Sequence, residues 1–323
     1  MIDRRTLFAT AAAAAAAAAI PGAPAMAKAP LVGKQAPGFF RFKLGDAEVT
    51  AINDGFFVRP VAGFVRNAMD DDVKEAVEEA HLPMAGSGVF IPFTTLVINT
   101  GDRLTLIDSG NGDSGAPTSG HWMTNFRAAG FDPKDVDSIV ISHFHGDHIN
   151  GLRLKDGTAV FANAEVLVPA TEWAFWMDDA RMSAAPDAAK PNFQNVRRVF
   201  GPIAKDVKRF EAGKEVVPGI NAIAAPGHTP GHTAFMIQHG SGKLLSLSDT
   251  TNNPYLFARN PEWQAVFDMN GDEAVTTRRK LLDMAASERA RIHLYHAPFP
   301  ATGFIEKDDD GYDFTLATWT SAL

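Results

Sequence analysis

The sequence predicts a mixed fold of the α/β (α+β) class, in which two β-sheets pack face to face and helices cover the outside. Candidate strands occur in pairs, joined by glycine-containing turns, and helical segments separate the pairs. The long alternation of strands and helices that builds a single parallel sheet is missing. Histidine and aspartate residues follow directly after several of the strands, so they are expected along one rim of the sheets.

The candidate strands are short apolar runs bounded by turn residues. They cover residues 39–43, 48–53, 93–99, 104–108, 137–141, 166–168, 220–225, 235–238, 244–247 and 291–295. Apolar residues at helical spacing predict helices over residues 69–80, 123–129, 169–178 and 273–288. Asp54 and Gly55 are expected to end the second strand, and Gly130 to end the second helix. Asp272 is expected to cap the last helix.

Residues 60–88 do not fit easily into either sheet or into a covering helix, apart from the acidic helix that they contain. We interpret this segment as an arm that covers the functional site or a partner subunit. An ordinary surface excursion explains the same pattern equally well.

One stretch carries an unusual density of metal-binding side chains. Ser142 to Gly151 reads SHFHGDHING, with three histidines and an aspartate in six consecutive positions. Imidazole nitrogens and carboxylate oxygens are the ligands that zinc and related divalent metals prefer. His143 and His145 are two residues apart, so at a strand end they point to the same side. Gly146 lets the backbone turn toward the next two donors, and one turn could feed two adjacent metals; a histidine-rich polar loop is the alternative.

The segment HFHGDH resembles the HxHxDH signature of the metallo-β-lactamase superfamily. Further ligands of that family have counterparts in the same order, namely His228 in PGHTPGHT, Asp249 in LLSLSDT and His296 in IHLYHAPFP. The resemblance implies a four-layer αββα sandwich with two divalent metal ions, zinc in the first place and manganese, cobalt or iron as alternatives. One ion is then held by His143, His145 and His228 and the other by Asp147, His148 and His296, with Asp249 bridging the two.

Several other polar residues near these ligands are interpreted as structural. Asp108, in an Asp-Ser-Gly corner similar to one in the superfamily, is expected to form hydrogen bonds beneath the metals. His232 is expected to hold a neighbouring ligand loop, and His293 to lie inside the last strand.

The chain also resembles the methyl parathion hydrolase group over most of residues 28–323. The matching stretches are APGFFRFKLGDAEVTAINDG, PGHTPGHT and HAPFP. Members of that group are exported two-metal hydrolases, often dimeric, that act on phosphotriesters, lactones or aryl esters. The resemblance therefore implies a small-molecule substrate and a homodimer.

The resemblance also identifies Trp176 and Phe193 as substrate-binding aromatics, with core packing as the alternative for each. A third aromatic expected within residues 111–116 is absent, because the stretch reads NGDSGA. Efficient phosphotriester hydrolysis is therefore not expected. Acyl-homoserine-lactone lactonases carry a tyrosine three positions after the bridging aspartate, where this chain has Asn252.

The family mechanism implies that a hydroxide bridging the two metals attacks the substrate, while Asp147 or Asp249 passes a proton to the leaving group. Two other functions are compatible with the same scaffold. Some relatives bind a single iron and oxidise persulfides, and a metal-binding protein without turnover is the third alternative.

Composition and the amino terminus limit the choice of partners and compartment. The net charge of -8 and the lack of a basic run argue against nucleic-acid binding, and the absence of cysteine excludes a thiolate ligand or nucleophile. Residues 1–27 resemble a twin-arginine export signal, with Arg4 and Arg5 before an alanine run and an A-x-A site ending at Ala27. The sequence thus predicts a periplasmic or secreted domain over residues 28–323, without a membrane anchor after cleavage; an uncleaved anchor or a Sec signal is the alternative.

Overall fold

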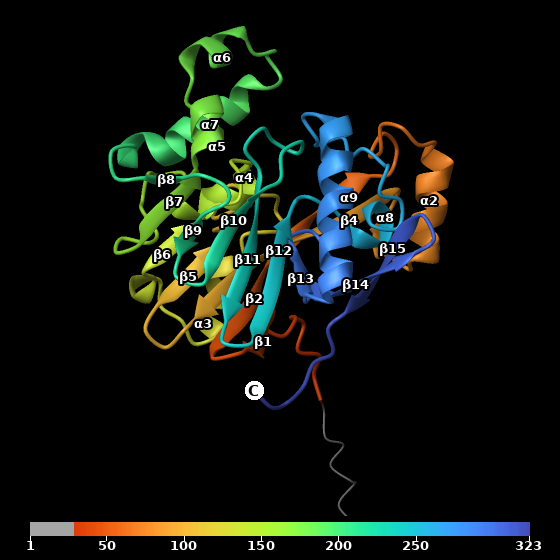
Figure 1. The fold of residues 1–323 in the computed structure, drawn as a ribbon, viewed down its shortest axis with the longest axis horizontal. Coiled ribbons are helices and arrows are strands. Elements are labelled where there is room, and N and C mark those ends of the chain that lie inside the picture. Colours follow the sequence, from red (N-terminus) through yellow and green to blue (C-terminus); the bar gives the residue numbers. More distant parts are fainter. Residues whose placement is uncertain (1–28) are drawn as a thin grey trace, which may run out of the picture. The chain divides into compact units, whose positions relative to one another are not determined.

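Two β-sheets lie face to face in residues 37–323 of the protein, and helices flank them (Figure 1). The computed structural model describes residues 29–323, so the expected export signal lies outside the described residues. Residues 29–36 contain no helix or strand.

The first sheet has eight strands in the order β1-β2-β4-β5-β6-β7-β8, with β3 paired to β4. Its strands are β1 (Phe39–Leu44), β2 (Ala47–Pro60), β3 (Met84–Ala85), β4 (Gly88–Asn99), β5 (Leu104–Ile107), β6 (Ser138–Val140), β7 (Glu165–Pro169) and β8 (Lys208–Phe210). The pairs from β5 to β8 are parallel and the others are antiparallel.

The second sheet has seven strands in the order β15-β14-β13-β12-β11-β10-β9. Its strands are β9 (Glu215–Val217), β10 (Ile220–Ala224), β11 (Thr233–His239), β12 (Gly242–Ser248), β13 (Arg291–Leu294), β14 (Thr302–Asp308) and β15 (Gly311–Leu316). Only β12 and β13 pair in parallel.

The α-helices connect the strands and cover the sheets. They are α2 (Asp70–Glu79), α3 (Trp122–Ala128), α4 (Gly146–Ile149), α5 (Ala170–Trp176), α6 (Asp179–Ala184), α7 (Lys190–Phe200), α8 (Pro254–Phe257) and α9 (Gly271–Glu288). Within residues 29–323, none of the helices combines the length and apolar character that crossing a membrane requires.

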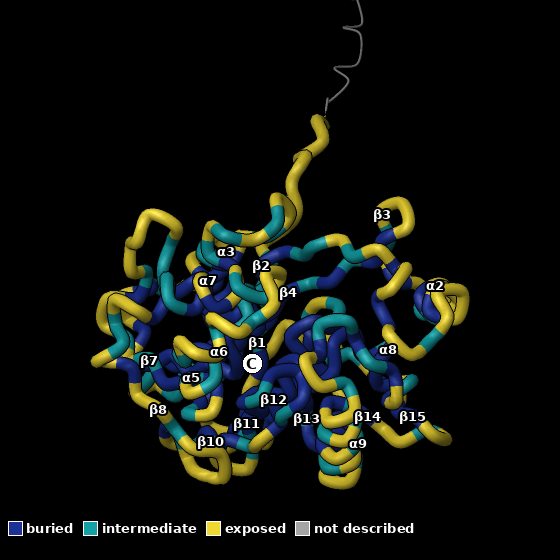
Figure 2. The backbone as a smooth tube through the Cα atoms, turned by 90° about the horizontal axis from the view of Figure 1, so that it is seen from above, coloured by how far each residue is buried: buried dark blue, intermediate teal, exposed yellow. Residues whose placement is uncertain are grey.

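Alternating side chains of the strands supply three apolar layers. On β4, Leu96 points into the layer between the two sheets, where it joins Phe235 of β11, and Val97 points outward under α3. On the far side, Leu281 of α9 packs on Leu245 of β12. Figure 2 shows β12 and β13 buried, whereas α2 and α9 present exposed surfaces. The predicted αββα sandwich is therefore confirmed.

The second strand does not end at Asp54 and Gly55, contrary to the prediction. The pairing of β2 with β4 shifts register between Asn53 and Gly55, so the two residues form a bulge and the strand continues to Pro60. The bulge turns the Asp54 carboxylate inward, where it accepts hydrogen bonds from the backbone N–H groups of Asn111 at 2.6 Å and Trp122 at 2.7 Å. A turn signal in the sequence cannot show whether a strand ends at that point or only bulges and continues.

The arm at residues 60–88 packs on its own chain. Its apolar residues Phe64, Val73 and Val77 are buried against residues of the 256–265 segment, such as Phe257 and Trp263, in a separate small core. The arm is thus attached to the body of its own chain, and through Arg66 it reaches the cavity that is described below.

Other differences have local causes. The cap of α9 is Asn270 rather than Asp272, because the Asn270 side chain accepts the N–H of Glu273 at 3.3 Å. Helix α6, the 11-residue helix α7 and the hairpin of β14 and β15 lie where the sequence predicted no element. Strands of three to seven residues at a sheet edge carry little periodic signal.

A close contact between two hairpin turns offers a test of how the sheets are joined. Gly45 lies in the turn between β1 and β2. A Cβ atom added there would lie 1.8 Å from the carbonyl oxygen of His239, at the end of β11 in the second sheet. Gly101 also has positive φ, but nothing lies within 4 Å of its added Cβ.

Gly45→Ala should therefore destabilise the protein more than Gly101→Ala. The conformational cost of a left-handed alanine is about 1–2 kcal/mol in both variants, and overpacking adds about 1–3 kcal/mol at Gly45 only. Urea unfolding of both variants measures the difference. Equal losses of stability would show that the two turns are not in firm contact.

Candidate metal centre

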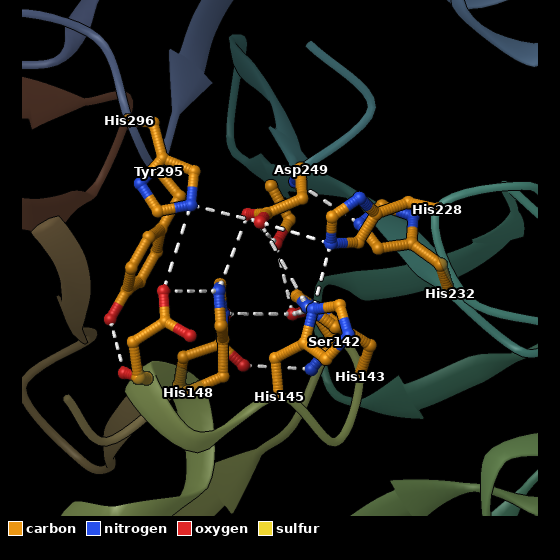
Figure 3. Close-up of polar contacts among 12 residues, drawn as sticks. Ser142, His143, His145, His148, His228, His232, Asp249, Tyr295 and His296 are labelled. Atoms are coloured by element: carbon orange, nitrogen blue, oxygen red, sulfur yellow. Dashed lines mark hydrogen bonds and ion pairs between the residues drawn. The ribbon is translucent and has the colours of Figure 1, made fainter. Parts of the chain in front are cut away.

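All seven predicted ligands lie together at one end of the two sheets (Figure 3). The structure brings together His143, His145, Asp147, His148, His228, Asp249 and His296. They follow the ends of β6, β10, β12 and β13, so residues up to 153 positions apart in the chain meet because four strands end at the same rim.

The HFHGDH segment supplies four of these ligands through a change of backbone conformation. His143 and His145 follow β6, and the extended conformation of His145 lets Gly146 begin the short helix α4. Asp147 and His148 then occupy its first turn. The predicted turn is thus a helix start, and it presents the second pair of donors next to the first.

Three imidazoles form one half of the centre. The Nδ1 atom of His145 lies 3.1 Å from Nε2 of His143 and 2.9 Å from Nε2 of His228. One carboxylate oxygen of Asp249, Oδ2, lies 3.3 Å from Nε2 of His228. One ligand atom from each of these four residues lies within 4.8 Å of the others.

Two imidazoles and Asp147 form the other half. Nε2 of His148 lies 3.3 Å from Oδ2 of Asp147 and 3.3 Å from Oδ1 of Asp249. Nε2 of His296 lies 2.9 Å from Oδ2 of Asp249. Asp249 thus faces both halves, as Figure 3 shows, which is the arrangement expected of a bridging carboxylate.

Acceptors behind the imidazoles fix which nitrogen carries the proton. Nδ1 of His296 lies 2.9 Å from the carbonyl oxygen of Pro92, which can only accept, so this nitrogen is the donor. Nδ1 of His148 contacts Asp108 at 2.8 Å, and Nδ1 of His228 contacts Asp268 at 2.9 Å. The Nε2 lone pairs of all three rings therefore point into the centre.

This donor set fits two divalent cations. Nε2 of His148 is buried and has no hydrogen-bond partner, although two carboxylates face it. Lone pairs and carboxylate charges that converge in a buried site repel one another unless a cation lies between them. Each half offers four donor residues when Asp249 is shared, which suits the four-coordinate geometry of zinc among other metals.

Burial and charge also set the protonation of the ligands. Burial lowers the pKa of His145 to about 3 and the pKa of His143 well below its ordinary value, so both rings are neutral at pH 7. Burial acts in the same direction on the pKa of His148, but the charges of Asp249, Asp147 and Asp108 raise it well above its ordinary value. A metal ion bound to this half therefore competes with a proton.

Three residues have the structural roles predicted for them. His232 accepts the backbone N–H of Asp249 at 3.1 Å and so holds the bridging ligand. His293 contacts Ser246 and the carbonyl oxygen of Thr94 within the sheets, each at 3.0 Å. Asp108 accepts the N–H of Ser142 at 2.8 Å, directly before the first ligand.

A cavity of about 680 Å³ opens onto the metal centre. Trp176 lines it, only 2% exposed, and the ring centroid of Phe193 lies 4.7 Å behind the Trp176 ring. Phe193 belongs to the core and does not line the cavity, so its predicted direct contact with substrate is not what the structure shows. The 111–116 segment forms part of the cavity wall through Ser114 and its neighbours. The aromatic that this segment lacks would therefore have faced the cavity.

Sequence reasoning missed much of the rest of the cavity and its support. Phe57 and Phe93 stack at 5.7 Å, and Phe267 meets Phe57 edge-on at 6.1 Å. These rings come from β2, β4 and the 258–270 connection, and no local pattern links them. Asp268 was missed for the same reason, because it approaches His228 from 40 residues away.

Comparison with known proteins agrees with this geometry. An N-acyl homoserine lactonase of a Bacillus species is 26% identical over 171 residues, which cover 53% of this chain and 59% of that protein. The N-acyl homoserine lactonase AttM of Agrobacterium fabrum is 27% identical over 184 residues, which cover 50% and 66%. The chain thus spans about three fifths of the length of the first curated relatives that it matches.

Solved structures match over more of the chain. A hydrolase of the beta-lactamase superfamily, AbOPH, has a TM-score of 0.84 at 26% identity and covers 89% of this chain and 100% of that chain. AidC, a dizinc quorum-quenching lactonase solved with a product N-acyl-homoserine, has a TM-score of 0.82 at 26% identity, with 88% and 99% covered. The family model described as "Metallo-beta-lactamase superfamily" matches residues 87–296, more than half of the sequence. From the fold, the donor set and this match, the chain belongs to the metallo-beta-lactamase superfamily.

Proposed function

We propose that this protein is a hydrolase that uses two divalent metal ions to open lactones of the N-acyl homoserine class. The observation that carries the proposal is the complete double set of donors around Asp249, placed at the floor of a substrate-sized cavity. The similarity to AidC and to the curated lactonases supports the same reaction.

When bound, two such metals supply a hydroxide at neutral pH and polarise the carbonyl that it attacks. The chain's own residues determine where this happens. The imidazoles and Asp249 hold the two halves at a fixed spacing, and aromatic side chains such as Phe57, Phe93 and Phe267 line the cavity that opens onto them. The donors for a second ion favour this function over a single-iron redox site, and the open cavity favours turnover over metal binding alone.

The two carboxylates predicted to be catalytic differ in access. The Asp147 side chain is 20% exposed and lines the cavity, whereas the Asp249 side chain is 4% exposed and lies between both sets of histidines. We therefore assign proton transfer to Asp147. As a carboxylate it would first take the proton that the attacking hydroxide loses and then give it to the leaving oxygen, while Asp249 keeps the bridging role alone. A lactone needs such a transfer, because its alkoxide leaving group is a strong base.

The cavity is lined by two chemically different kinds of group that suit an acylated lactone. Phe57, Phe93, Phe267 and Met269 provide apolar surface for an acyl chain. Asn111, Asn150, Asn192 and Asn252 provide amide groups for ester and amide oxygens. Asn252 stands where the lactonases carry their tyrosine, so carbonyl binding here would use a shorter side chain. Tyr255 does not replace it, since it packs on Phe314 away from the cavity.

Export and assembly complete the proposal. We infer export through the twin-arginine-type signal in residues 1–27, followed by function as a homodimer in the periplasm or outside the cell. The paired arginines and the A-x-A site support export, and the resemblance to the methyl parathion hydrolase group supports the dimer.

His145→Ala tests the metal centre. His145 contributes Nδ1 at the cavity edge rather than in the core, so the variant should fold, bind less than two equivalents of metal, and lose at least about a hundredfold in lactone kcat/KM. Metal analysis and circular dichroism accompany the assay. His81→Ala, an exposed histidine on the arm, is the control. Full activity of His145→Ala at limiting metal would overturn the ligand assignment.

A substrate panel tests the specificity. On one zinc-loaded preparation, kcat/KM for an acyl homoserine lactone and for an aryl ester should exceed that for a methyl phosphotriester by about tenfold or more, because the pocket rather than the attacking group sets the preference. The loop at Ser114 lacks the aromatic that would align a tetrahedral phosphotriester. Ser114→Phe should raise phosphotriester turnover selectively. A phosphotriester rate tenfold above both other substrates would contradict the proposal.

A further inference from the structure

A buried carboxylate outside the ligand set lies beside the metal centre. Glu172, in the first turn of α5, is completely buried, and its neighbours along the helix are Trp173 and Trp176. A buried carboxylate is costly unless hydrogen bonds satisfy it. The partners of Glu172 therefore indicate why this position carries a charge.

Three N–H groups converge on the two oxygens of Glu172. Oε1 accepts the backbone N–H of Gly231 at 2.7 Å, and Oε2 accepts the backbone N–H of Phe144 at 3.0 Å. Oε2 also accepts the indole N–H of Trp176 at 2.8 Å. Both oxygens are thus occupied by donors, so Glu172 is not itself a metal ligand.

Two of these donors belong to loops that carry metal ligands. Phe144 lies between the ligands His143 and His145, and Gly231 lies in the loop that carries His228. These two loops come from opposite sheets, and together they supply all three histidines of one half of the centre. Trp176 adds the cavity wall, with its ring centroid 6.4 Å from that of His145.

Packing leaves little freedom around this carboxylate. A Cβ atom added to Gly231 would lie 2.4 Å from the backbone nitrogen of Glu172, so the His228 loop rests directly on the start of α5. The Phe144 ring packs on Phe200 at a ring-centroid distance of 4.5 Å. The Gly231 loop has no room to approach α5, and hydrogen bonds from Gly231 and Phe144 tie both loops to Glu172.

We propose that Glu172 is a positioning residue that fixes the three-histidine half of the metal centre and the Trp176 wall relative to each other. The inference rests on the two-metal centre of the proposed function but not on its substrate. Since the other half depends on α4, β12 and β13, which Glu172 does not contact, loss of the carboxylate should affect one metal site selectively.

Glu172→Gln is the main variant, because it keeps the shape but places an N–H₂ group against an N–H donor. Zinc affinity is measured for each site by competition with a chromophoric chelator, and cobalt(II) absorption reports the geometry of each bound ion. The full-length protein is used throughout. We expect one site to lose about tenfold to a hundredfold in affinity, and the other to stay unchanged.

Two matched variants separate the contributions. Trp176→Phe removes only the indole hydrogen bond and keeps an aromatic wall, so both zinc affinities should remain while KM for the lactone changes. Glu165→Gln removes an exposed carboxylate just before α5 and should change neither zinc affinity nor KM. Glu172→Asp keeps the charge but is too short to reach both loops, and it should show the same selective loss if Glu172→Gln does not fold.

The outcomes distinguish this inference from the proposed function. Wild-type protein that binds no second metal would contradict the two-metal function itself. Wild-type protein with two metals and a Glu172→Gln variant with both affinities unchanged would overturn only the role of Glu172. Equal loss at both sites would also overturn it, because a general loss of packing rather than positioning of one half would then explain the effect.

Discussion

The rest of the site depends on the position of the Asp249 carboxylate between two groups of imidazoles. Its two oxygens approach His148, His228 and His296 at 2.9–3.3 Å, so a shift of either sheet would break the arrangement. The backbone before it is strained, since Ser248 has a φ of 46°. A non-glycine residue in this region costs about 1–3 kcal/mol, and such strain persists only where surrounding contacts impose it. Here the hydroxyl of Ser248 donates to Ser142 at 2.9 Å, which joins the bridging ligand to the first ligand strand.

Buried charges form a chain of support that runs outward from the ligands. His228 contacts Asp268, and Asp268 lies 3.4 Å from the buried guanidinium of Arg278 on α9. Arg278 in turn donates to the carbonyl oxygens of Thr250 and Trp263. An outer helix thereby fixes an inner ligand, and removal of any one charge would leave its partner buried and unpaired. Because these contacts stabilise the same geometry that a metal needs, metal binding and folding stability are coupled in this part of the chain.

The ligands could be predicted from sequence because their chemistry is local. HFHGDH is contiguous, and His228, Asp249 and His296 each follow an apolar run, so strand ends alone place them on a rim. The supporting residues could not be predicted in this way. Asp54 resembled a turn residue, yet a bulge turns it inward, and Phe193 resembled a wall residue, yet α7 places it behind Trp176. In both cases the outcome depends on which distant segment packs against the residue, and periodicity carries no such information.

The metal ligands and much of the cavity wall come from different parts of the fold, and this separation affects how substrate specificity is encoded. The metal ligands come from strand ends that the sheets hold in place. Phe57 of β2 and Phe93 of β4 contribute to the cavity wall, but much of the wall comes from the arm, the 111–116 loop, α5 and the 264–269 segment. Arg66 of the arm lines the cavity and donates to the carbonyl oxygen of Val266 at 2.7 Å, so these two wall segments are tied to each other. Substitutions in these segments can change the accepted substrate without displacing a donor atom. Two positions are exceptions. Asp268 lines the cavity and contacts the ligand His228, and the Glu172 carboxylate contacts the wall residue Trp176 and two ligand loops. At these positions a change in the wall also changes the support of the metal site.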